Sequence, residues 1–269
     1  MLKIDSHNHT THSHDAVCSP EALTEGALNF GLDGIVVSDH ADIQDYTDIN
    51  SIPHILASVA DARRLNGKLK VLAGVELGEA VWDAAKAAEI VAAIQPDAVL
   101  SSVHAVRYGQ YTECFSRIDF TDWTAEMLDE YMTQYFADMQ EMVERVDMDI
   151  LTHLSNPVKY INGRYGKGIS LAPYSAAVDK ILKTVIEKEI SLELNLALVG
   201  TSYSVTMPEA DIMARYRQLG GRCVTIGSDA HVETRVGVNF DYGIKVLRSV
   251  GFDSYNYYEG RERKMVKFA

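Results

Sequence analysis

The sequence has few of the features that mark secreted or membrane proteins. Its three cysteines, Cys18, Cys114 and Cys223, are far apart and form no CxxC pair. An odd number of widely spaced cysteines argues against a disulfide framework and is typical of a reducing compartment. No apolar run approaches the roughly 18 residues of a membrane span, and no charged-then-apolar leader opens the chain. We therefore expect a cytoplasmic protein without a membrane partner.

Basic residues are also scarce. Lys and Arg together number 25 against 38 Asp and Glu, which gives a formal net charge of −13. A protein that binds nucleic acid needs a surplus of positive charge to neutralise the phosphates. The composition therefore argues against a nucleic-acid partner, although it is compatible with a local cationic site for one phosphate group.

What the sequence does contain is a regular alternation of strand-like and helix-like segments. Hydrophobic residues make up 47% of the chain, which is enough for one sizeable core. Short β-branched runs predict strands over 3–7, 34–38, 70–75, 97–103, 149–151, 191–196 and 222–226. Amphipathic spacing and capping residues predict helices over 20–30, 53–65, 83–94, 124–146, 173–188, 208–219 and 242–249. We assign 156–171 to a loop, and the tyrosine-rich stretch after residue 249 to no element.

Seven strand–helix units without a linker or a repeated motif predict a single α/β domain over residues 1–269, folded as a parallel-strand barrel. A doubly wound open sheet is the alternative. However, no GxGxxG motif follows the first strand, so the commonest reason for a doubly wound sheet is missing. The barrel is the preferred interpretation.

Histidines and carboxylates gather at the predicted strand ends, where the chemistry of parallel α/β barrels is located. These residues are His7, His9, His40, Glu76, His104, His153, Asp229 and His231. Burying so many ionisable groups without partners would cost on the order of several kcal/mol, and metal ions would supply the compensating charge. Of the remaining histidines, His12 and His14 lie in the first loop, and His54 in a helix is a surface or packing residue.

The chemistry of this residue set points to particular metals. Imidazole and carboxylate ligands suit Zn²⁺, Mn²⁺ or Fe²⁺ and disfavour a thiolate-type site. The candidate ligands exceed the needs of one ion, so we expect two or three ions bridged by a hydroxide and by a carboxylate, Glu76 or Asp229. Such a cluster generates a nucleophile near neutral pH and binds an oxyanion in line for attack.

The order of these residues resembles the polymerase and histidinol phosphatase (PHP) superfamily, with its HxH pair, the Ser38-Asp39-His40 triplet and the Asp229-Ala230-His231 triplet. More narrowly, HLSNPVKYINGRYG after the fifth predicted strand and LGGRCVTIGSDAH around the seventh are similar to histidinol-phosphate phosphatases of the HisK type. The resemblance implies a distorted (β/α)7 TIM-like barrel, three divalent metal ions, and Asp15 as a ninth ligand. It also implies hydrolysis of L-histidinol phosphate to L-histidinol and phosphate in histidine biosynthesis, by attack of a metal-bridging hydroxide.

The resemblance implies residue roles in the same way. The first ion takes His7, His9, Glu76 and Asp229, the second takes Asp15, His40 and His231, and the third takes Glu76, His104 and His153. Asp229, His231, Glu76 and Arg164 are the expected catalytic residues. Arg164 is also the first candidate to bind the substrate phosphate, because a planar guanidinium can donate two hydrogen bonds to phosphate oxygens, which a lysine ammonium does less well. Lys159, Arg107 and Asn195 are further substrate-binding candidates. Either a metal-bound water or a protonated side chain assists the leaving alkoxide, and the choice of side chain stays open among His12, His14 and Asp39.

One departure from the HisK pattern leaves the substrate open. HisK-type members typically carry an Arg a few residues after the position of Asn195, where this chain continues Leu-Ala-Leu-Val-Gly, and Arg235 is a candidate to replace it. A PHP-type phosphoesterase acting on a nucleotide, a sugar phosphate or phosphotyrosine is therefore an alternative. A metallo-amidohydrolase usually has a bridging lysine at a strand end, and none stands there. A vestigial cluster would lack ligands, whereas all nine are present. The sequence does not indicate an oligomeric state.

Overall fold

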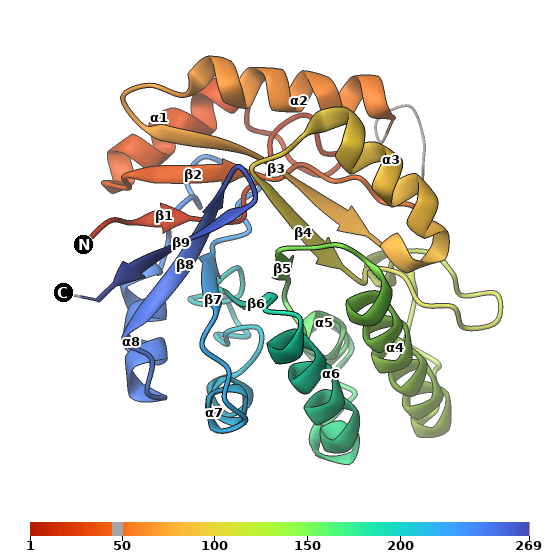
Figure 1. Cartoon of the computed structure of the whole chain (residues 1–269). Helices are drawn as coiled ribbons and strands as arrows, with labels where there is room; N and C mark the ends of the chain where they lie inside the picture. Colours follow the sequence, from red (N-terminus) through yellow and green to blue (C-terminus); the bar gives the residue numbers. More distant parts are fainter. Residues whose placement is uncertain (45–50, 269) are drawn as a thin grey trace.

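Seven parallel strands form one curved sheet, in chain order from β1 to β7, in the computed structural model, which describes residues 1–44 and 51–268 (Figure 1). Each strand pairs in parallel with the next along the chain. The strands are β1 (Ile4–Asp5), β2 (Gly34–Val37), β3 (Lys70–Gly78), β4 (Ala98–Ser102), β5 (Ile150–Leu151), β6 (Ser191–Asn195) and β7 (Val224–Gly227). Val36, Leu100 and Ile226 are fully buried, as expected of parallel strands that helices cover.

The two edges of this sheet meet through backbone hydrogen bonds just beyond β1 and β7. These bonds run from Ser6 N–H to Ile226 O (2.9 Å), from Asp229 N–H to His7 O (2.8 Å) and from His9 N–H to Ala230 O (2.8 Å). The sheet is therefore a nearly closed, distorted (β/α)7 barrel, which confirms the predicted fold class. Closure also places the HxH segment beside the Asp-Ala-His segment.

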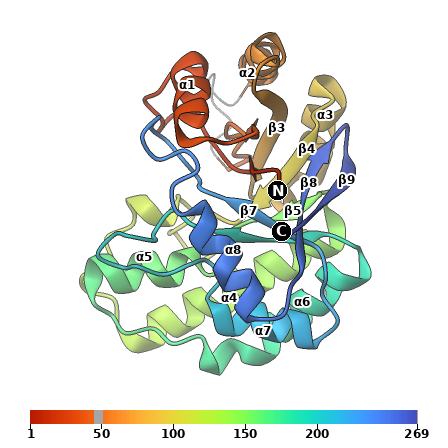
Figure 2. The same ribbon diagram turned by 90° about the vertical axis from the view of Figure 1, so that its left-hand side faces the viewer.

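Helices surround the barrel on its outer side (Figures 1 and 2). They are α1 (Pro20–Phe30), α2 (Ile52–Leu65), α3 (Ala84–Ile94), α4 (Ala125–Arg145), α5 (Asn156–Tyr165), α6 (Ser175–Glu187), α7 (Ala210–Gln218) and α8 (Phe240–Ser249). Short 3₁₀ turns within residues 1–44 and 51–268 are η2 (Ala80–Asp83), η3 (Phe115–Arg117) and η4 (Ala172–Tyr174). None of the helices in the described part of the chain combines the length and apolar character that a membrane span needs.

Local sequence signals explain where individual helices begin and end. The side chain of Ser19 accepts the N–H of Ala22 at the start of α1, and Gly31 ends that helix in the left-handed region, as its sequence predicts. The assignment of 156–171 to a loop is wrong for its first ten residues, which form α5. Pro157 lies in the first turn of this helix, and Gly166 ends it in the left-handed region. Arg164 therefore lies in the last turn of a helix.

The tyrosine-rich end of the chain forms an antiparallel hairpin, β8 (Ser254–Glu259) and β9 (Glu262–Lys267), that the sequence analysis did not assign. Its Tyr255 hydroxyl accepts the N–H of Ile4 and donates to the carbonyl of Leu2, both at 2.9 Å. The hairpin thus packs against the start of β1, at the end of the barrel opposite the carboxyl ends of the strands. Figure 2 shows both chain termini close together there.

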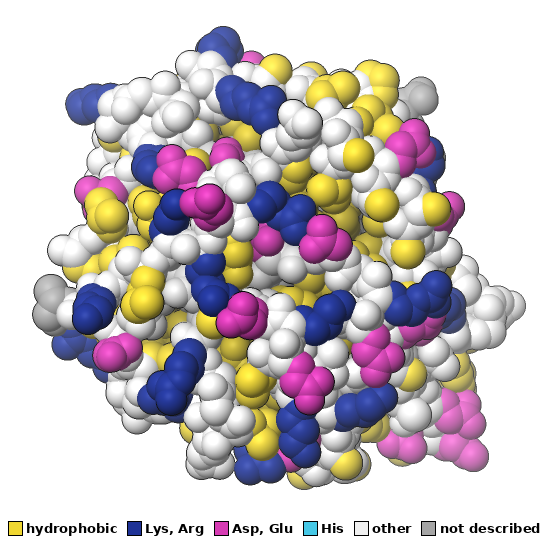
Figure 3. Space-filling model, in the orientation of Figure 1, with side chains coloured by type: hydrophobic (Ala, Val, Ile, Leu, Met, Phe, Trp, Pro, Cys, Tyr) yellow, Lys and Arg dark blue, Asp and Glu magenta, His cyan; other side chains and the backbone are white. Residues whose placement is uncertain are grey.

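The surface on the hairpin side carries Lys and Arg side chains interspersed with Asp and Glu (Figure 3). No histidine of the described residues is visible on this face. The histidines are gathered at the other end of the barrel.

Candidate metal centre

The carboxyl ends of the strands bring together the side chains that the sequence singles out. His7 and His9 follow β1, His40 follows β2, and Glu76 lies within β3, which extends to Gly78 rather than ending at residue 75. His104, His153, Asp229 and His231 lie two to four residues beyond the ends of their strands. His7, His9, His40, Glu76 and His153 are buried, and His104, Asp229 and His231 are partly buried.

Glu76 lies at the centre of this group, and each of its carboxylate oxygens faces imidazole nitrogens. Its Oε1 atom lies 3.0 Å from His153 Nε2 and 3.6 Å from His104 Nε2. Its Oε2 atom lies 3.3 Å from His7 Nε2, 3.5 Å from His9 Nε2 and 3.1 Å from His40 Nδ1. One buried carboxylate therefore connects the two halves of the cluster.

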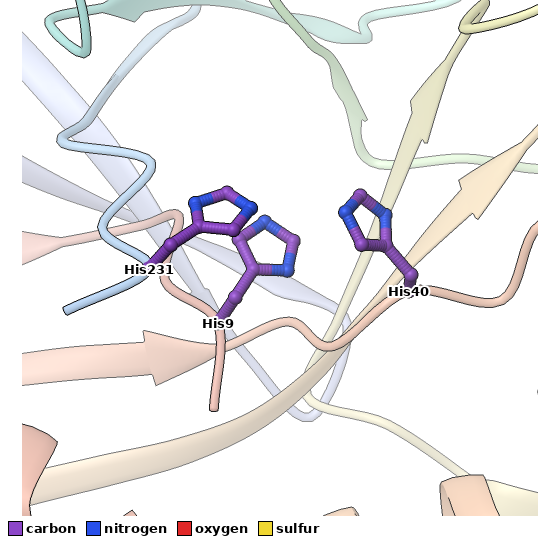
Figure 4. Close-up of side chains that lie close together, drawn as sticks. All are labelled: His9, His40 and His231. Carbon is purple, nitrogen blue, oxygen red and sulfur yellow. The ribbon is translucent and has the colours of Figure 1, made fainter. Parts of the chain in front are cut away.

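Asp229 and Asp15 complete the cluster on the side of the first loop. Asp229 Oδ1 lies 3.3 Å from His9 Nε2. The two oxygens of Asp15 lie 3.5 Å from His40 Nε2 and 3.3 Å from His231 Nε2. Figure 4 shows the rings of His9, His40 and His231 gathered face to face, with the ring centroids of His9 4.3 Å from those of both neighbours.

A second row of polar groups fixes which nitrogen of each ring carries a proton. Glu193, in β6, accepts the Nδ1–H of His7 at 2.7 Å and the backbone N–H of His153 at 2.8 Å. The hydroxyl of Ser13 donates to Asp39 at 2.8 Å, so it accepts from Nδ1 of His9, 3.1 Å away. Nε2 is therefore the ring nitrogen that both His7 and His9 turn toward the cluster.

These two Nε2 atoms face each other, with His7 Nε2 3.0 Å from His9 Nε2. Oε2 of Glu76 and Nδ1 of His40 are buried without a hydrogen-bond partner. Imidazole nitrogens and a carboxylate converge on one region, and polar partners hold the opposite ring nitrogens of His7 and His9. Such a donor set fits divalent cations.

Electrostatics within the cluster keep its carboxylates ionised. Burial raises the pKa of Asp229, but the neighbouring His7 and His9 hold that pKa well below its usual range. The pKa of Glu76 is likewise held well below its usual range, because His7 and His104 outweigh the effect of burial. Burial, His40 and His231 lower the pKa of His9 to about 4, so this ring stays neutral and available as a ligand.

The backbone is strained where Asp229 enters the site. This residue adopts a φ of 52°, in the left-handed region that non-glycine residues rarely occupy. Its N–H is bonded to the carbonyl of His7, which belongs to the barrel closure. Strain of this kind persists where surrounding structure holds it and is common at functional sites.

The cluster opens into a cavity of about 200 Å³. Seven of the nine candidate ligands line it, whereas His7 and His9 lie deeper. The rest of the wall includes Asp42 and Glu79 and, on the other side, the residues Cys114, Phe115, Ser116, Arg117, Asn156 and Tyr160. No lysine lines the cavity among the described residues, so the bridging lysine of a metallo-amidohydrolase has no counterpart here.

None of the predicted phosphate-binding residues lines this cavity. Arg107 pairs with Asp138 at 2.7 Å, and Lys159 pairs with Glu209. Arg164 is exposed and donates to the hydroxyl of Tyr160.

The other two substrate-binding candidates, Asn195 and Arg235, donate hydrogen bonds to groups of the protein. Asn195 is buried and donates to Asp229 Oδ2 at 3.2 Å, which positions that carboxylate. Arg235 donates to the carbonyl of Ala197 at 2.8 Å.

The structure also shows where the candidate proton donors Asp39, His12 and His14 lie. Asp39 is saturated, since Thr10, Ser13 and Ser58 all donate to its carboxylate. His12 contacts Asp61 at 3.0 Å, away from the cavity, whereas His14 lines it. His54 contacts the carbonyl of His12 at 3.0 Å, in keeping with a packing role.

The sequence analysis missed Glu193, Asp42 and Glu79. Glu193 is a charged residue at the centre of an apolar strand, Ser-Leu-Glu-Leu-Asn, and that contrast is the signal that identifies it. Asp42 lies 3.4 Å from His104 Nδ1. Burial and the carboxylate of Asp42 raise the pKa of Glu79 to about 8, and Glu79 accepts the backbone N–H groups of His104 and Ala105.

A parallel barrel with this cluster at its carboxyl end is the architecture of a metal-dependent hydrolase. The model of the PHP domain family matches residues 5–197, most of the chain, and the chain belongs to that family. It is 26% identical to a probable histidinol-phosphatase of Clostridium acetobutylicum, over the full length of both chains. It is 25% identical to a probable histidinol-phosphatase of Thermotoga maritima, over 98% of this chain and 99% of the relative.

The fold matches a solved structure of the same type. The histidinol phosphate phosphatase of Lactococcus lactis, crystallised with zinc, L-histidinol and phosphate, superposes with a TM-score of 0.79. The match covers 97% of this chain and 98% of that one, at 20% sequence identity. It establishes the shared fold.

Proposed function

We propose that this chain is a metal-dependent phosphomonoesterase that hydrolyses L-histidinol phosphate. In that reaction an oxygen of water attacks phosphorus, the bond between phosphorus and the ester oxygen breaks, and a proton passes to the leaving alkoxide to give L-histidinol. The full-length similarity to histidinol-phosphatases supports this substrate. The proposal is for an enzyme of histidine biosynthesis that acts on a small phosphorylated compound.

The observation that carries the proposal is the pair of imidazole Nε2 atoms of His7 and His9, 3.0 Å apart and directed at Glu76. We assign three divalent cations, zinc, manganese or iron, to three ligand sets. These are His7, His9, Glu76 and Asp229; Asp15, His40 and His231; and Glu76, His104 and His153. The contacts within each set support this division, because Glu76 and Asp229 lie near His9, Asp15 lies near His40 and His231, and Glu76 lies near His104 and His153. Cations held in this way supply Lewis acidity and lower the pKa of water.

The residues of the chain have distinct tasks in this proposal. Glu76 and Asp229 hold the cluster together by joining its ligand sets, and His231 closes it beside the cavity. Glu193, Ser13 and Asn195 hold His7, His9 and Asp229 in the orientation that binding requires. Arg164 stays the sequence-based candidate for a phosphate contact, one residue removed from the cavity through Tyr160.

The test is phosphate release from a substrate panel after reconstitution with Mn²⁺, Zn²⁺ or Fe²⁺. The panel holds L-histidinol phosphate, AMP, a sugar phosphate and a phosphotyrosine peptide. We expect kcat/KM for L-histidinol phosphate to exceed the others by at least ~100-fold, which is about 2.7 kcal/mol of discrimination. Equal rates on all four esters would refute this substrate while leaving a phosphatase.

One observation favours a second candidate, a PHP-type phosphatase for another small phosphate ester. The segment from Glu189 to Ala214, which includes the loop after β6, contains no Lys or Arg. The chain also matches a probable phosphatase of Thermoanaerobacter sp., at 23% identity over 93% of this chain. The same panel separates the two candidates, because the second predicts that AMP, the sugar phosphate or the peptide is hydrolysed fastest.

A further inference from the structure

The cavity in front of the metal-ligand cluster is strongly acidic. Five of its lining residues are carboxylates: Asp15, Asp42, Glu76, Glu79 and Asp229. Among the described residues that line it, Arg117 is the one Lys or Arg. A phosphate dianion that enters this cavity therefore meets one guanidinium, and a guanidinium binds phosphate oxygens in a bidentate manner.

Two further basic side chains near this end of the barrel, Arg107 and Lys159, lie outside the cavity. Arg107 donates two hydrogen bonds to Asp138, at 3.0 and 2.7 Å, and a further one to Glu141. Lys159 is paired with Glu209. Neither residue lines the cavity, so neither substitutes for Arg117.

The turn that carries Arg117 is fixed from both sides. The N–H of Phe115, at the start of η3, donates to the carbonyl of His104 at 2.8 Å, which joins the turn to a candidate metal ligand. From α5, the hydroxyl of Tyr160 donates to the carbonyl of Ser116 at 2.8 Å. The hydroxyl of Tyr165 donates to the carbonyl of Ile118 at 3.0 Å. The residues on both sides of Arg117 are therefore anchored.

Arg164 contacts both of the tyrosines, Tyr160 and Tyr165, that anchor the turn. Its guanidinium lies 5.7 Å from the ring centres of both Tyr160 and Tyr165, and it donates to the Tyr160 hydroxyl. A cation over two aromatic rings orders both of them. Arg164 thus acts on the cavity through the two tyrosines that hold the Arg117 turn.

We propose that Arg117 is the side chain that binds the phosphoryl group of the substrate, and that Arg164 is a positioning residue for it. The inference rests on the proposed function in one respect, that the substrate is a phosphomonoester. It replaces Arg164 with Arg117 as the direct phosphate contact.

The test measures binding of inorganic phosphate to the metal-reconstituted protein by calorimetry, together with its metal content. We expect Arg117→Ala to weaken phosphate binding by about 10- to 100-fold, the usual range for loss of a charge-assisted hydrogen bond. Arg117→Lys retains the positive charge but not the bidentate guanidinium, so its phosphate affinity should lie between those of the parent chain and Arg117→Ala. Arg222→Ala, an exposed arginine in a groove beside β9, is the matched control and should bind phosphate like the parent chain.

Measurements of turnover distinguish a direct phosphate contact from a structural role. Added guanidinium ion should restore part of the kcat/KM of Arg117→Ala and none of that of Arg164→Ala. Unchanged phosphate affinity in Arg117→Ala at full metal content would overturn the inference. The binding assay uses inorganic phosphate and no ester. Loss of phosphate affinity in Arg117→Ala therefore supports the inference even if the parent chain does not hydrolyse L-histidinol phosphate. Failure to hydrolyse that ester would refute only the proposed substrate.

Discussion

Replacing Glu193 by glutamine tests the hydrogen-bonded support behind the metal cluster. The two residues have the same shape, but the amide has one accepting and one donating end. The carboxylate of Glu193 accepts from donors at both ends: from His7 Nδ1–H at 2.7 Å, and from His153 N–H at 2.8 Å and Asn195 Nδ2 at 3.1 Å. In either orientation, the amide of the variant places an N–H group against a donor.

The unfavourable contact has a specific consequence at His7. If the amide nitrogen faces its ring, the proton moves from Nδ1 to Nε2, the atom that lies 3.3 Å from Glu76 and 3.0 Å from His9 Nε2. A protonated Nε2 cannot bind a metal ion. Second-row substitutions of this kind typically reduce metal affinity by about 10- to 100-fold, which corresponds to roughly 1.4–2.7 kcal/mol.

The assay is a chelator competition with metal content measured at each step, followed by phosphatase activity at saturating metal. We expect Glu193→Gln to lose metal at a lower chelator concentration than the parent chain. The matched control is Glu189→Gln, an exposed position just before the same strand, and it should behave like the parent. Parent-like metal affinity in Glu193→Gln would refute the assignment of the His7 proton to Nδ1.

Three further substitutions test the cluster and the scaffold around it. His9→Ala should abolish turnover while circular dichroism stays that of the parent, and retained activity would contradict the cluster. Tyr255→Phe removes a buried hydroxyl that joins two backbone groups at the start of the chain, so urea unfolding should show a loss of roughly 1–2 kcal/mol; the exposed Tyr242→Phe serves as its control. Gly227→Ala would place a Cβ atom 2.3 Å from a carboxylate oxygen that supports the cluster. It should reduce both metal content and the thermal midpoint, whereas Gly67→Ala, with nothing closer than 4.0 Å, should change neither.

Periodicity and chemistry in the sequence are sufficient to predict the barrel and the ligand cluster. Strands such as Gly34–Val37 are short apolar runs that only a buried parallel sheet accommodates, and a histidine follows several of them. The helix α5 was missed although Pro157 in its first turn and Gly166 at its end are helix signals. The hairpin was missed because its stability depends on contacts with distant residues such as Ile4, which no local pattern reveals.

The phosphate side of the site is harder to predict for a physical reason. A metal ligand is recognised by its residue type, since few side chains bind metal and strand ends converge on one place. A Lys or Arg can bind phosphate, but it can equally form an ion pair with an acidic side chain of the protein. Its role can therefore be predicted only when its neighbours in the fold are known. Arg107 and Lys159 are held in this way by Asp138 and Glu209.

The candidate metal ligands that follow β1 and β7 lie where the two edges of the sheet meet, so the segments that close the barrel also carry candidate ligands. The N–H of Asp229 is bonded to the carbonyl of His7, so one hydrogen bond both closes the barrel and joins two candidate ligands. Asp5, fully buried, accepts the backbone N–H groups of Ser228 and Gly237 at 2.9 Å and ties the same two segments together. Because β1 and β7 form no strand ladder of their own, cations that bind across this junction stabilise the closed state over any open one. Metal binding and closure of the seven-stranded barrel are therefore thermodynamically linked.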